Sequence, residues 1–277
     1  MRIILSRKGF DSNTGGITSP IFENGDMISF PIPENKENKV SDDTFDLLHY
    51  NGLNFTNLLC QLGYKQKQRC HIDPDLVKDR RVNRESVENW KAIFGQCDSA
   101  ATHLDKTIKV REGDIFLFFG NFHCVENHNG IYQKVNKTGD FYKDNDLQVI
   151  WGYMQVKDII RDHEKQKENK WHPHSKPYYI DKKTNIMYVS YNKLTFNKNL
   201  DAYGILKFRK DRVLTKENYS KANWIKNPVY DEGSVIGNRN NKSKDKNTSV
   251  YYQGQWQELG LEETKECENW AKKIIEE

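Results

Sequence analysis

The first side chains that could support chemistry follow directly after the first apolar run of the chain. That run, residues 3–5, predicts a buried strand. It is followed by hydroxyl, cationic and acidic side chains and by two adjacent glycines: Ser6, Arg7, Lys8, Asp11, Gly15 and Gly16. Glycine lets backbone amides approach a ligand, and amides beside cations bind anions. We therefore expect a phosphate-binding loop, although a surface hairpin with polar turn residues explains the same composition.

A second group of titratable residues has alternating spacing. His71, Asp73 and Asp75 are separated by single residues, so an extended chain would point all three to one face. Imidazole and carboxylate together suit a divalent metal or an acid–base pair. The alternative is that Asp75 caps the following turn and His71 is an ordinary surface residue.

Two further patterns carry imidazoles. Gln96 and His103 are two helical turns apart, so they could face one cavity, or they could simply pack in a core. His172 and His174 flank Pro173, and this pair could bind a metal together with His71 or Asp73, or contact a base or ribose. The neighbouring aromatic residues Trp171, Tyr178 and Tyr179 offer faces on which a nucleobase could stack.

These patterns lead to assigned roles. We expect the catalytic groups to be Asp11, His71, Asp73 and His103. We expect ligand or phosphate binding by Ser6, Arg7, Lys8, Gly15, Gly16, Gln96, His172 and His174. The sequence identifies no cofactor, although the histidines and carboxylates would suit a divalent metal.

The elements that must position these residues predict an α+β protein. Apolar or aromatic runs predict strands at 27–30, 115–119, 149–156, 186–190, 202–209 and 250–252. The segment 31–35 is expected to be a turn, and the spacing of Val87, Trp90 and Phe94 predicts a helix. A C-terminal amphipathic helix is expected over 262–275. We expect one domain, 1–277, with a mixed, partly barrel-like sheet, a helical insertion at about 42–108 and a flexible loop at 231–249.

Composition limits the class of protein. The chain has 277 residues, ample for a core, and a formal net charge of +4 from 43 basic and 39 acidic residues. This charge is too small to demonstrate nucleic-acid binding by itself. Five cysteines without CxxC spacing favour reduced thiols, and no apolar run is long enough for a membrane span. We expect a cytoplasmic protein without a membrane partner; the sequence does not predict its oligomeric state.

A family resemblance adds to these patterns. The strand–hairpin–strand region at 113–156 resembles the small barrels of PUA, ASCH and EVE type, which implies recognition of a nucleotide or a base. The chain as a whole resembles a bacterial and phage family, the nucleotide modification associated domain of the third type. The matching motifs are ILSRKGFDS (4–12), GG (15–16), SPI (19–21), HIDPDL (71–76), FGQ (94–96), AATHL (100–104), GDIFLFFG (113–120), WGYMQV (151–156), HPH (172–174) and GQ (254–255).

The resemblance implies modification of a nucleotide or of a base in DNA. We therefore expect an enzyme, a transferase or a hydrolase, with a nucleotide or nucleic acid as its partner. The alternative is a non-catalytic PUA-like reader of a modified base or nucleotide signal. The two differ in geometry, because an enzyme needs Asp11, His71 and Asp73 to converge on one reacting atom.

Overall fold

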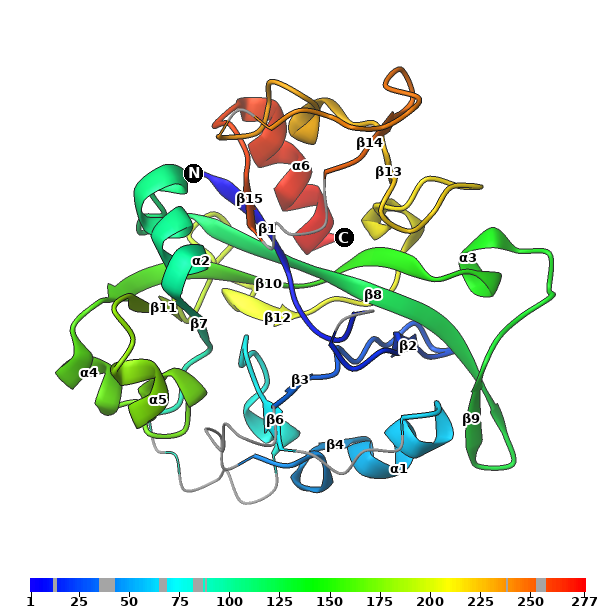
Figure 1. Cartoon of the computed structure of the whole chain (residues 1–277), viewed down its shortest axis with the longest axis horizontal. Coiled ribbons are helices and arrows are strands. Elements are labelled where there is room, and N and C mark those ends of the chain that lie inside the picture. Colours follow the sequence, from blue (N-terminus) through cyan, green and yellow to red (C-terminus); the bar gives the residue numbers. More distant parts are fainter. Residues whose placement is uncertain are drawn as a thin grey trace.

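A computed structural model describes the chain except for residues 12–13, 35–42, 65–68, 82–86, 88, 238 and 253–257. Its centre is a pair of 14-residue antiparallel strands, β8 (Ile115–His128) and β10 (Leu147–Ile160). These belong to a nine-stranded mixed sheet that curls into a half-barrel (Figure 1). The protein is thus α+β, as the sequence predicts.

The order of strands along the sheet is β15, β1, β8, β10, β11, β7. The flanking strands are β15 (Glu258–Gly260), β1 (Ile3–Arg7), β11 (Asn185–Ser190) and β7 (Ile93–Cys97). β1 runs parallel to β8, and the other pairs along this order are antiparallel. Three short strands extend it: β2 (Ser19–Ile21) and β9 (Ile131–Lys134) pair with β8, and β12 (Tyr203–Ile205) pairs with β10.

Aromatic packing and two register shifts accompany the curl of the sheet. Phe94, Phe116, Phe118 and Tyr188 are buried against one another, with ring centroids 4.9–5.9 Å apart. β10 shifts register twice, at positions 150–152 and 156–158. An extra residue in one strand bends the sheet locally and increases its twist. The four aromatic residues belong to the main hydrophobic core of the protein.

The helices are short except at the C-terminus. They are α1 (Phe55–Gln61), α2 (Asp98–Thr102), α3 (Phe141–Asp144), α4 (His163–Lys167), α5 (Pro177–Ile180) and α6 (Lys265–Glu276), and α2 continues into a π-helical stretch, His103–Ile108. The 3₁₀ turns are Phe45–Leu47, Lys78–Arg80, Pro173–Ser175, Lys210–Arg212 and Pro228–Tyr230. Asn54 caps α1 by accepting hydrogen bonds from the amides of Thr56 and Asn57.

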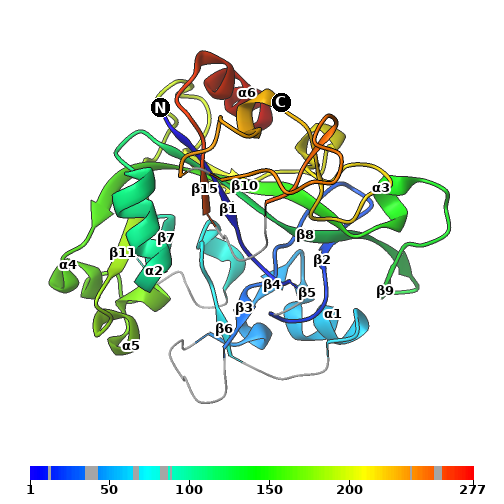
Figure 2. The ribbon, with the colours of Figure 1, turned by 45° about the horizontal axis from the view of Figure 1, so that its top comes forward.

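Two layers cover the sheet on opposite sides. α6 lies on one side with Cys267, Ala271, Ile274 and Ile275 buried (Figures 1 and 2). The other side holds α1 and the short strands β3 (Ile32–Pro33), β4 (His49–Tyr50), β5 (Leu53–Asn54) and β6 (Cys70–His71). This second layer has its own core around Phe10, Phe30 and Phe55. β13 (Trp224–Ile225) and β14 (Ser249–Val250) pair separately.

Most predicted strands are confirmed, and three local predictions are wrong. Phe94 lies in β7 and not in a helix, because its side chain packs into the aromatic interior of the sheet. Only Met27, through one bridge to Ile21, is paired in the segment predicted as a strand at 27–30. β3 lies where the turn at 31–35 was expected.

Two further predictions concern longer segments, the helical insertion at about 42–108 and the flexible loop at 231–249. The range 42–108 contains α1 and α2, but it also supplies β7 to the central sheet, so it is mixed rather than helical. In 231–249, Asn241 and Ser243 are buried and hydrogen-bonded to Ser249. The flexibility of that segment stays a prediction. All five cysteines are free thiols, as predicted.

Candidate functional site

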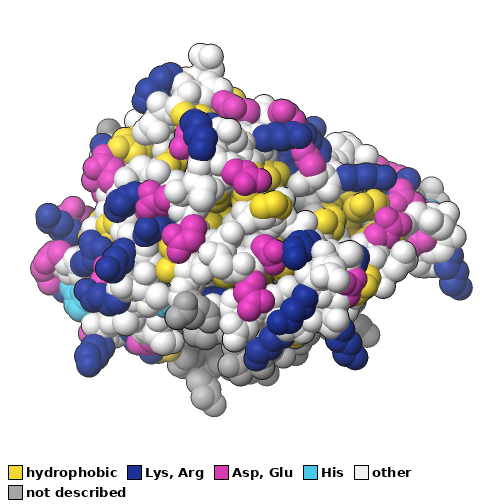
Figure 3. All heavy atoms as spheres, turned by 90° about the horizontal axis from the view of Figure 1, so that it is seen from above, with side chains coloured by type: hydrophobic (Ala, Val, Ile, Leu, Met, Phe, Trp, Pro, Cys, Tyr) yellow, Lys and Arg dark blue, Asp and Glu magenta, His cyan; other side chains and the backbone are white. Residues whose placement is uncertain are grey.

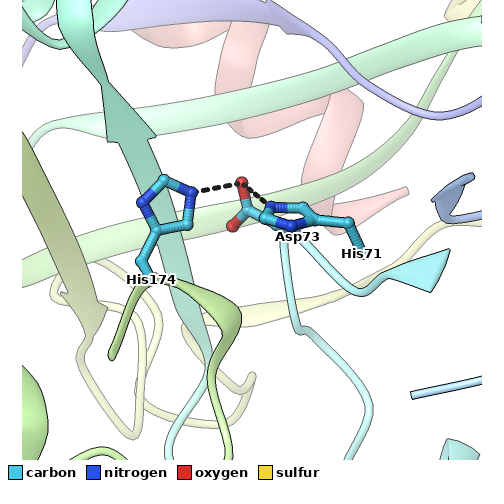
Figure 4. A group of neighbouring side chains, drawn as sticks. All are labelled: His71, Asp73 and His174. Atoms are coloured by element: carbon cyan, nitrogen blue, oxygen red, sulfur yellow. Dashed lines mark ion pairs between the residues drawn. The ribbon is translucent and has the colours of Figure 1, made fainter. Parts of the chain in front are cut away.

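The structure brings the two histidine motifs together around one carboxylate. His71 ends β6, and Asp73 follows it by two residues. His172 and His174 flank Pro173 at the 3₁₀ turn Pro173–Ser175. Figure 4 shows the imidazoles of His71 and His174 directed at the Asp73 carboxylate. We call these four residues the His–Asp cluster.

Both oxygens of Asp73 have polar neighbours. Oδ1 accepts a 2.7 Å hydrogen bond from the amide of Gly95 and lies 3.3 Å from Nε2 of His172. Oδ2 lies 3.8 Å from Nε2 of His71 and 3.8 Å from Nε2 of His174. Burial alone would raise the pKa of Asp73, but the contacts with His172 and His71 hold this pKa well below its usual range. Asp73 is therefore a buried, ionised carboxylate.

The orientation of His174 is determined by Asn185 on β11. Nδ2 of Asn185 donates to Gln166 Oε1 and to the His174 carbonyl, both at 2.9 Å. Oδ1 of Asn185 therefore faces Nδ1 of His174, at 2.7 Å, and this assignment puts the ring proton on Nδ1. Burial lowers the pKa of His174 to about 3, so the imidazole is neutral and its Nε2 carries a lone pair.

Two contacts keep the His174 ring in place. The Tyr179 ring stacks on it with centroids 4.1 Å apart and planes 21° apart. A side chain at Gly95 would place its Cβ 2.3 Å from the His174 ring, so only glycine fits there without a shift. Gly95 therefore serves the cluster twice, through its amide and through its missing side chain.

The other two imidazoles differ in their hydrogen bonding. Nδ1 of His172 accepts a 3.2 Å hydrogen bond from the amide of His174, so the proton of a neutral His172 lies on Nε2, facing Asp73. Nδ1 of His71 lies 3.2 Å from the Tyr179 hydroxyl. His71, Asp73 and His174 each offer one ligand atom, and these atoms lie within 4.8 Å of one another, which is a spacing that a metal ion could occupy.

A small cavity adjoins the cluster. Its volume is about 30 Å³, and Gly9, Ser29, Asp73, Asp75 and Arg80 are among the residues that line it. The N-terminal loop and the segment after His71 thus share one hollow. Asp75 does not join the imidazoles, because its Oδ2 accepts a 3.2 Å hydrogen bond from Trp90 Nε1.

The predicted phosphate loop is largely bonded to itself. Asp11 accepts a 2.8 Å hydrogen bond from the amide of Thr14, and its carboxylate lies 3.4 Å from Arg7. The amide of Gly16 donates to the Asp11 carbonyl at 2.9 Å, and Gly15 packs against the Phe10 ring. These contacts of Asp11 are thus with Arg7 and with its own turn, and its predicted catalytic role stays a prediction.

Lys8, Gln96 and His103 belong to a second polar cluster, at the end of the curled sheet. Lys8 Nζ lies 3.1 Å from Glu258 Oε1, with both side chains buried, and Gln96 Nε2 donates to the same oxygen at 2.7 Å. Arg239 contacts His103 Nε2 at 3.1 Å and the Glu258 carbonyl at 2.8 Å. Lys8 is thus paired with a carboxylate and is not positioned as a solvent-facing phosphate ligand.

Ser6 extends this second cluster. It is buried beside Glu258 in the register of β1 and β15, and its hydroxyl has no hydrogen-bond partner among the described residues. Residues 253–257 precede Glu258 and lie outside the described residues, as do Ser12 and the predicted motif at 254–255. The predicted roles of Ser6, Lys8, Gln96 and His103 stay predictions.

Sequence reasoning missed the residues that orient the histidines and neutralise Lys8. Asn185 on β11 lies 11 positions from His174 and 19 from Gln166 on α4, whereas Glu258 on β15 lies 250 positions from Lys8. Their residue types carry no local signal, because asparagine, glutamine and glutamate are common on surfaces. The register of β11 against β7 pairs Asn185 with Cys97, and this pairing holds Asn185 on the side of the sheet where His174 lies.

The fold and the cluster together define an α+β protein with a curled mixed sheet and a buried histidine–carboxylate centre. The chain matches the family described as nucleotide modification associated domain 3 over residues 2–264, and it belongs to this family. The resemblance predicted from the motifs is thereby confirmed. No curated protein and no solved structure matches the chain.

Proposed function

We propose that this protein is an enzyme that modifies a nucleotide or a base in DNA, with the His–Asp cluster as its reacting centre. The observation that carries the proposal is the buried carboxylate of Asp73 surrounded by His71, His172 and His174. A reader of bases needs shape and stacking, whereas a carboxylate among three imidazoles supports proton transfer or metal chemistry. The name of the family supports nucleotide modification in general and no particular reaction.

An exposed aromatic residue beside the cluster would suit a nucleobase. Tyr178 is 39 % exposed, and its neighbour Tyr179 stacks on His174. Lys182 Nζ lies 4.6 Å from the centroid of the Tyr178 ring. Stacking on an aromatic face with a cation close by is a common way to hold a base and its phosphate. We assign this role to Tyr178 in place of Trp171, which packs against Ile93, Met187 and Val189.

Surface charge does not suggest extended nucleic-acid binding on the face that carries α6. Basic and acidic side chains are interspersed there among the described residues (Figure 3). No helix in the described part of the chain is long and apolar enough to cross a bilayer. The substrate that we favour is a single nucleotide or one base extruded from DNA, in keeping with the name of the family.

The experiment compares wild type with Asp73→Asn and with a control, Asp201→Asn. Asp201 is an exposed carboxylate paired with Lys193. Each form is expressed in bacteria, and the nucleotide pool and digested DNA are analysed by mass spectrometry. We expect a new nucleoside mass from wild type and the control, reduced about 10²-fold or more by Asp73→Asn.

Two results would contradict the proposal. If folded Asp73→Asn made the same product as wild type, the cluster would not be the reacting centre. If wild type made no new nucleoside but retained a nucleotide through purification, the PUA-like reader function would be favoured over catalysis.

A further inference from the structure

We propose that the His–Asp cluster binds one divalent transition-metal ion through Nε2 of His71, Oδ2 of Asp73 and Nε2 of His174. His172 is a positioning residue and not a ligand. The ion would lie in the reacting centre of the proposed function. Its catalytic role rests on that function, but its presence can be measured without any nucleotide.

The proton of the His174 ring lies on Nδ1, on the side away from Asp73. Asn185 accepts from Nδ1, so the lone pair of Nε2 points to the side of the ring that faces Asp73. The two atoms, His174 Nε2 and Asp73 Oδ2, are 3.8 Å apart, which is too long for a hydrogen bond. A lone pair facing a buried carboxylate is unfavourable, and a cation bound to both atoms removes this repulsion.

Each of the two imidazole ligands has a partner at its other ring nitrogen. Nδ1 of His174 donates to Asn185, and Nδ1 of His71 lies 3.2 Å from the Tyr179 hydroxyl, which can accept its proton. Metal-binding histidines almost always donate their second ring N–H in this way, which leaves the other nitrogen free for the metal. His174 meets this condition through Asn185, and the Tyr179 hydroxyl, which can accept as well as donate, permits it for His71.

The two carboxylate oxygens of Asp73 have different partners. Oδ1 accepts from the amide of Gly95 and faces the protonated Nε2 of His172. His172 cannot be a ligand in this state, because its Nδ1 already accepts from the amide of His174. Oδ2 lies between His71 and His174 (Figure 4) and is left for the ion.

Two imidazoles and one carboxylate suit zinc, iron(II) or manganese(II) better than calcium or magnesium, which prefer all-oxygen sites. Three protein ligands leave coordination positions open for water or substrate. The cavity beside Asp73, of about 30 Å³, has room for roughly one water molecule. A site with this ligand count is typical of a catalytic metal and not of a structural one.

The test begins with the wild-type protein. It is stripped with EDTA, dialysed, and titrated with zinc by calorimetry and with cobalt(II) by visible absorption. We expect one equivalent of either ion per chain. The visible absorption of the bound cobalt(II) should be of the kind given by a cobalt ion with a low coordination number. Less than a tenth of an equivalent of both ions would overturn the proposal, whatever any variant does.

Variants then assign the ligands. His71→Ala and His174→Ala are each expected to weaken zinc binding more than 100-fold, whereas His172→Ala should keep the stoichiometry and weaken binding about 10–100-fold, as outer partners do. His128→Ala, an exposed histidine, is the control and should bind as wild type does. Unchanged zinc affinity in folded His174→Ala would overturn the ligand assignment. If a variant does not fold, X-ray absorption of the wild-type zinc complex must show two imidazole ligands.

The proposed function and the metal site can fail separately. Metal binding without any modified nucleoside would leave the metal site standing and remove the function. Modification at full rate by the EDTA-stripped protein would leave the function standing and remove the ion from its mechanism.

Discussion

The side-chain amide of Gln96 donates a 2.7 Å hydrogen bond to Oε1 of Glu258, and this bond joins the two ends of the curled sheet. Glu258 lies on β15, the first strand of the sheet order, and Gln96 lies on β7, the last. The preceding residue, Gly95, donates its amide to Asp73. Consecutive residues of one edge strand therefore serve the closure of the sheet and the His–Asp cluster.

Removing the charge of Lys8 should destabilise the protein strongly. Lys8→Met leaves the carboxylate of Glu258 buried without its cation, and breaking one partner of a buried pair costs about 3–5 kcal/mol. The double variant Lys8→Met with Glu258→Gln should recover part of this loss, because no unpaired charge then remains. Urea unfolding measures both free energies.

The control for that prediction is Lys193→Met. Lys193 pairs with Asp201 at the surface, and such pairs are worth about 0–1 kcal/mol. An equal loss of stability in Lys8→Met and Lys193→Met would show that burial of the Lys8–Glu258 pair has no energetic consequence.

A methyl group at position 95 should disrupt the His–Asp cluster. In Gly95→Ala the new Cβ would lie 2.3 Å from the His174 ring, so the ring or β7 must move. We expect a loss of about 1–3 kcal/mol in the free energy of unfolding. Gly204→Ala is the matched strand control, because its Cβ would meet Tyr153 at an ordinary 3.5 Å. Equal stability of the two variants would contradict the packing of Gly95 on His174.

The stability of the protein should fall below about pH 6.5 partly because of His103. Burial and the charge of Arg239 lower the pKa of His103 from its ordinary value of 6.5. Below pH 6.5 the unfolded chain therefore binds a proton that the folded protein does not yet bind, and the free energy of unfolding decreases with falling pH.

The measurement compares wild type with His103→Gln between pH 8 and pH 5. The stability of wild type relative to the variant should be constant above about pH 7 and should decline below pH 6.5. A difference that does not change across this range would mean that His103 has the same pKa in the folded and unfolded states.

Substrate affinity should depend on the ring of Tyr178. Base–aromatic stacking contributes about 1–3 kcal/mol, so Tyr178→Ala should weaken nucleotide binding about 5–150-fold, while Tyr178→Phe should keep most of it. Tyr219→Ala is the control, because Tyr219 is exposed to nearly the same extent as Tyr178, at 38 %, and also lies beneath a lysine, Lys216. Equal effects of the two alanine variants on the dissociation constant would remove Tyr178 from the binding site.

Local sequence patterns determined the elements whose signal lies within a few residues. The apolar runs at 115–119 and 149–156 identify the two central strands, because a segment buried on both faces must be apolar throughout. The amphipathic spacing of α6 is likewise local. The motif HPH, which stiffens the spacing of two imidazoles, marked His172 and His174 as functional candidates before their surroundings were known.

Tertiary structure alone decided which residues meet. His71 and His174 are about a hundred positions apart, and strand pairing and loop packing bring them to Asp73. The same long-range packing pairs Lys8 with Glu258, whereas Asp11 accepts a hydrogen bond within its own turn. Phe94 shows the limit most clearly, since its helical spacing with Val87 and Trp90 is a local pattern, whereas burial between Phe116 and Tyr188 depends on strands far along the chain. Periodicity reports which side of an element is apolar; only the register of distant strands determines what that side contacts.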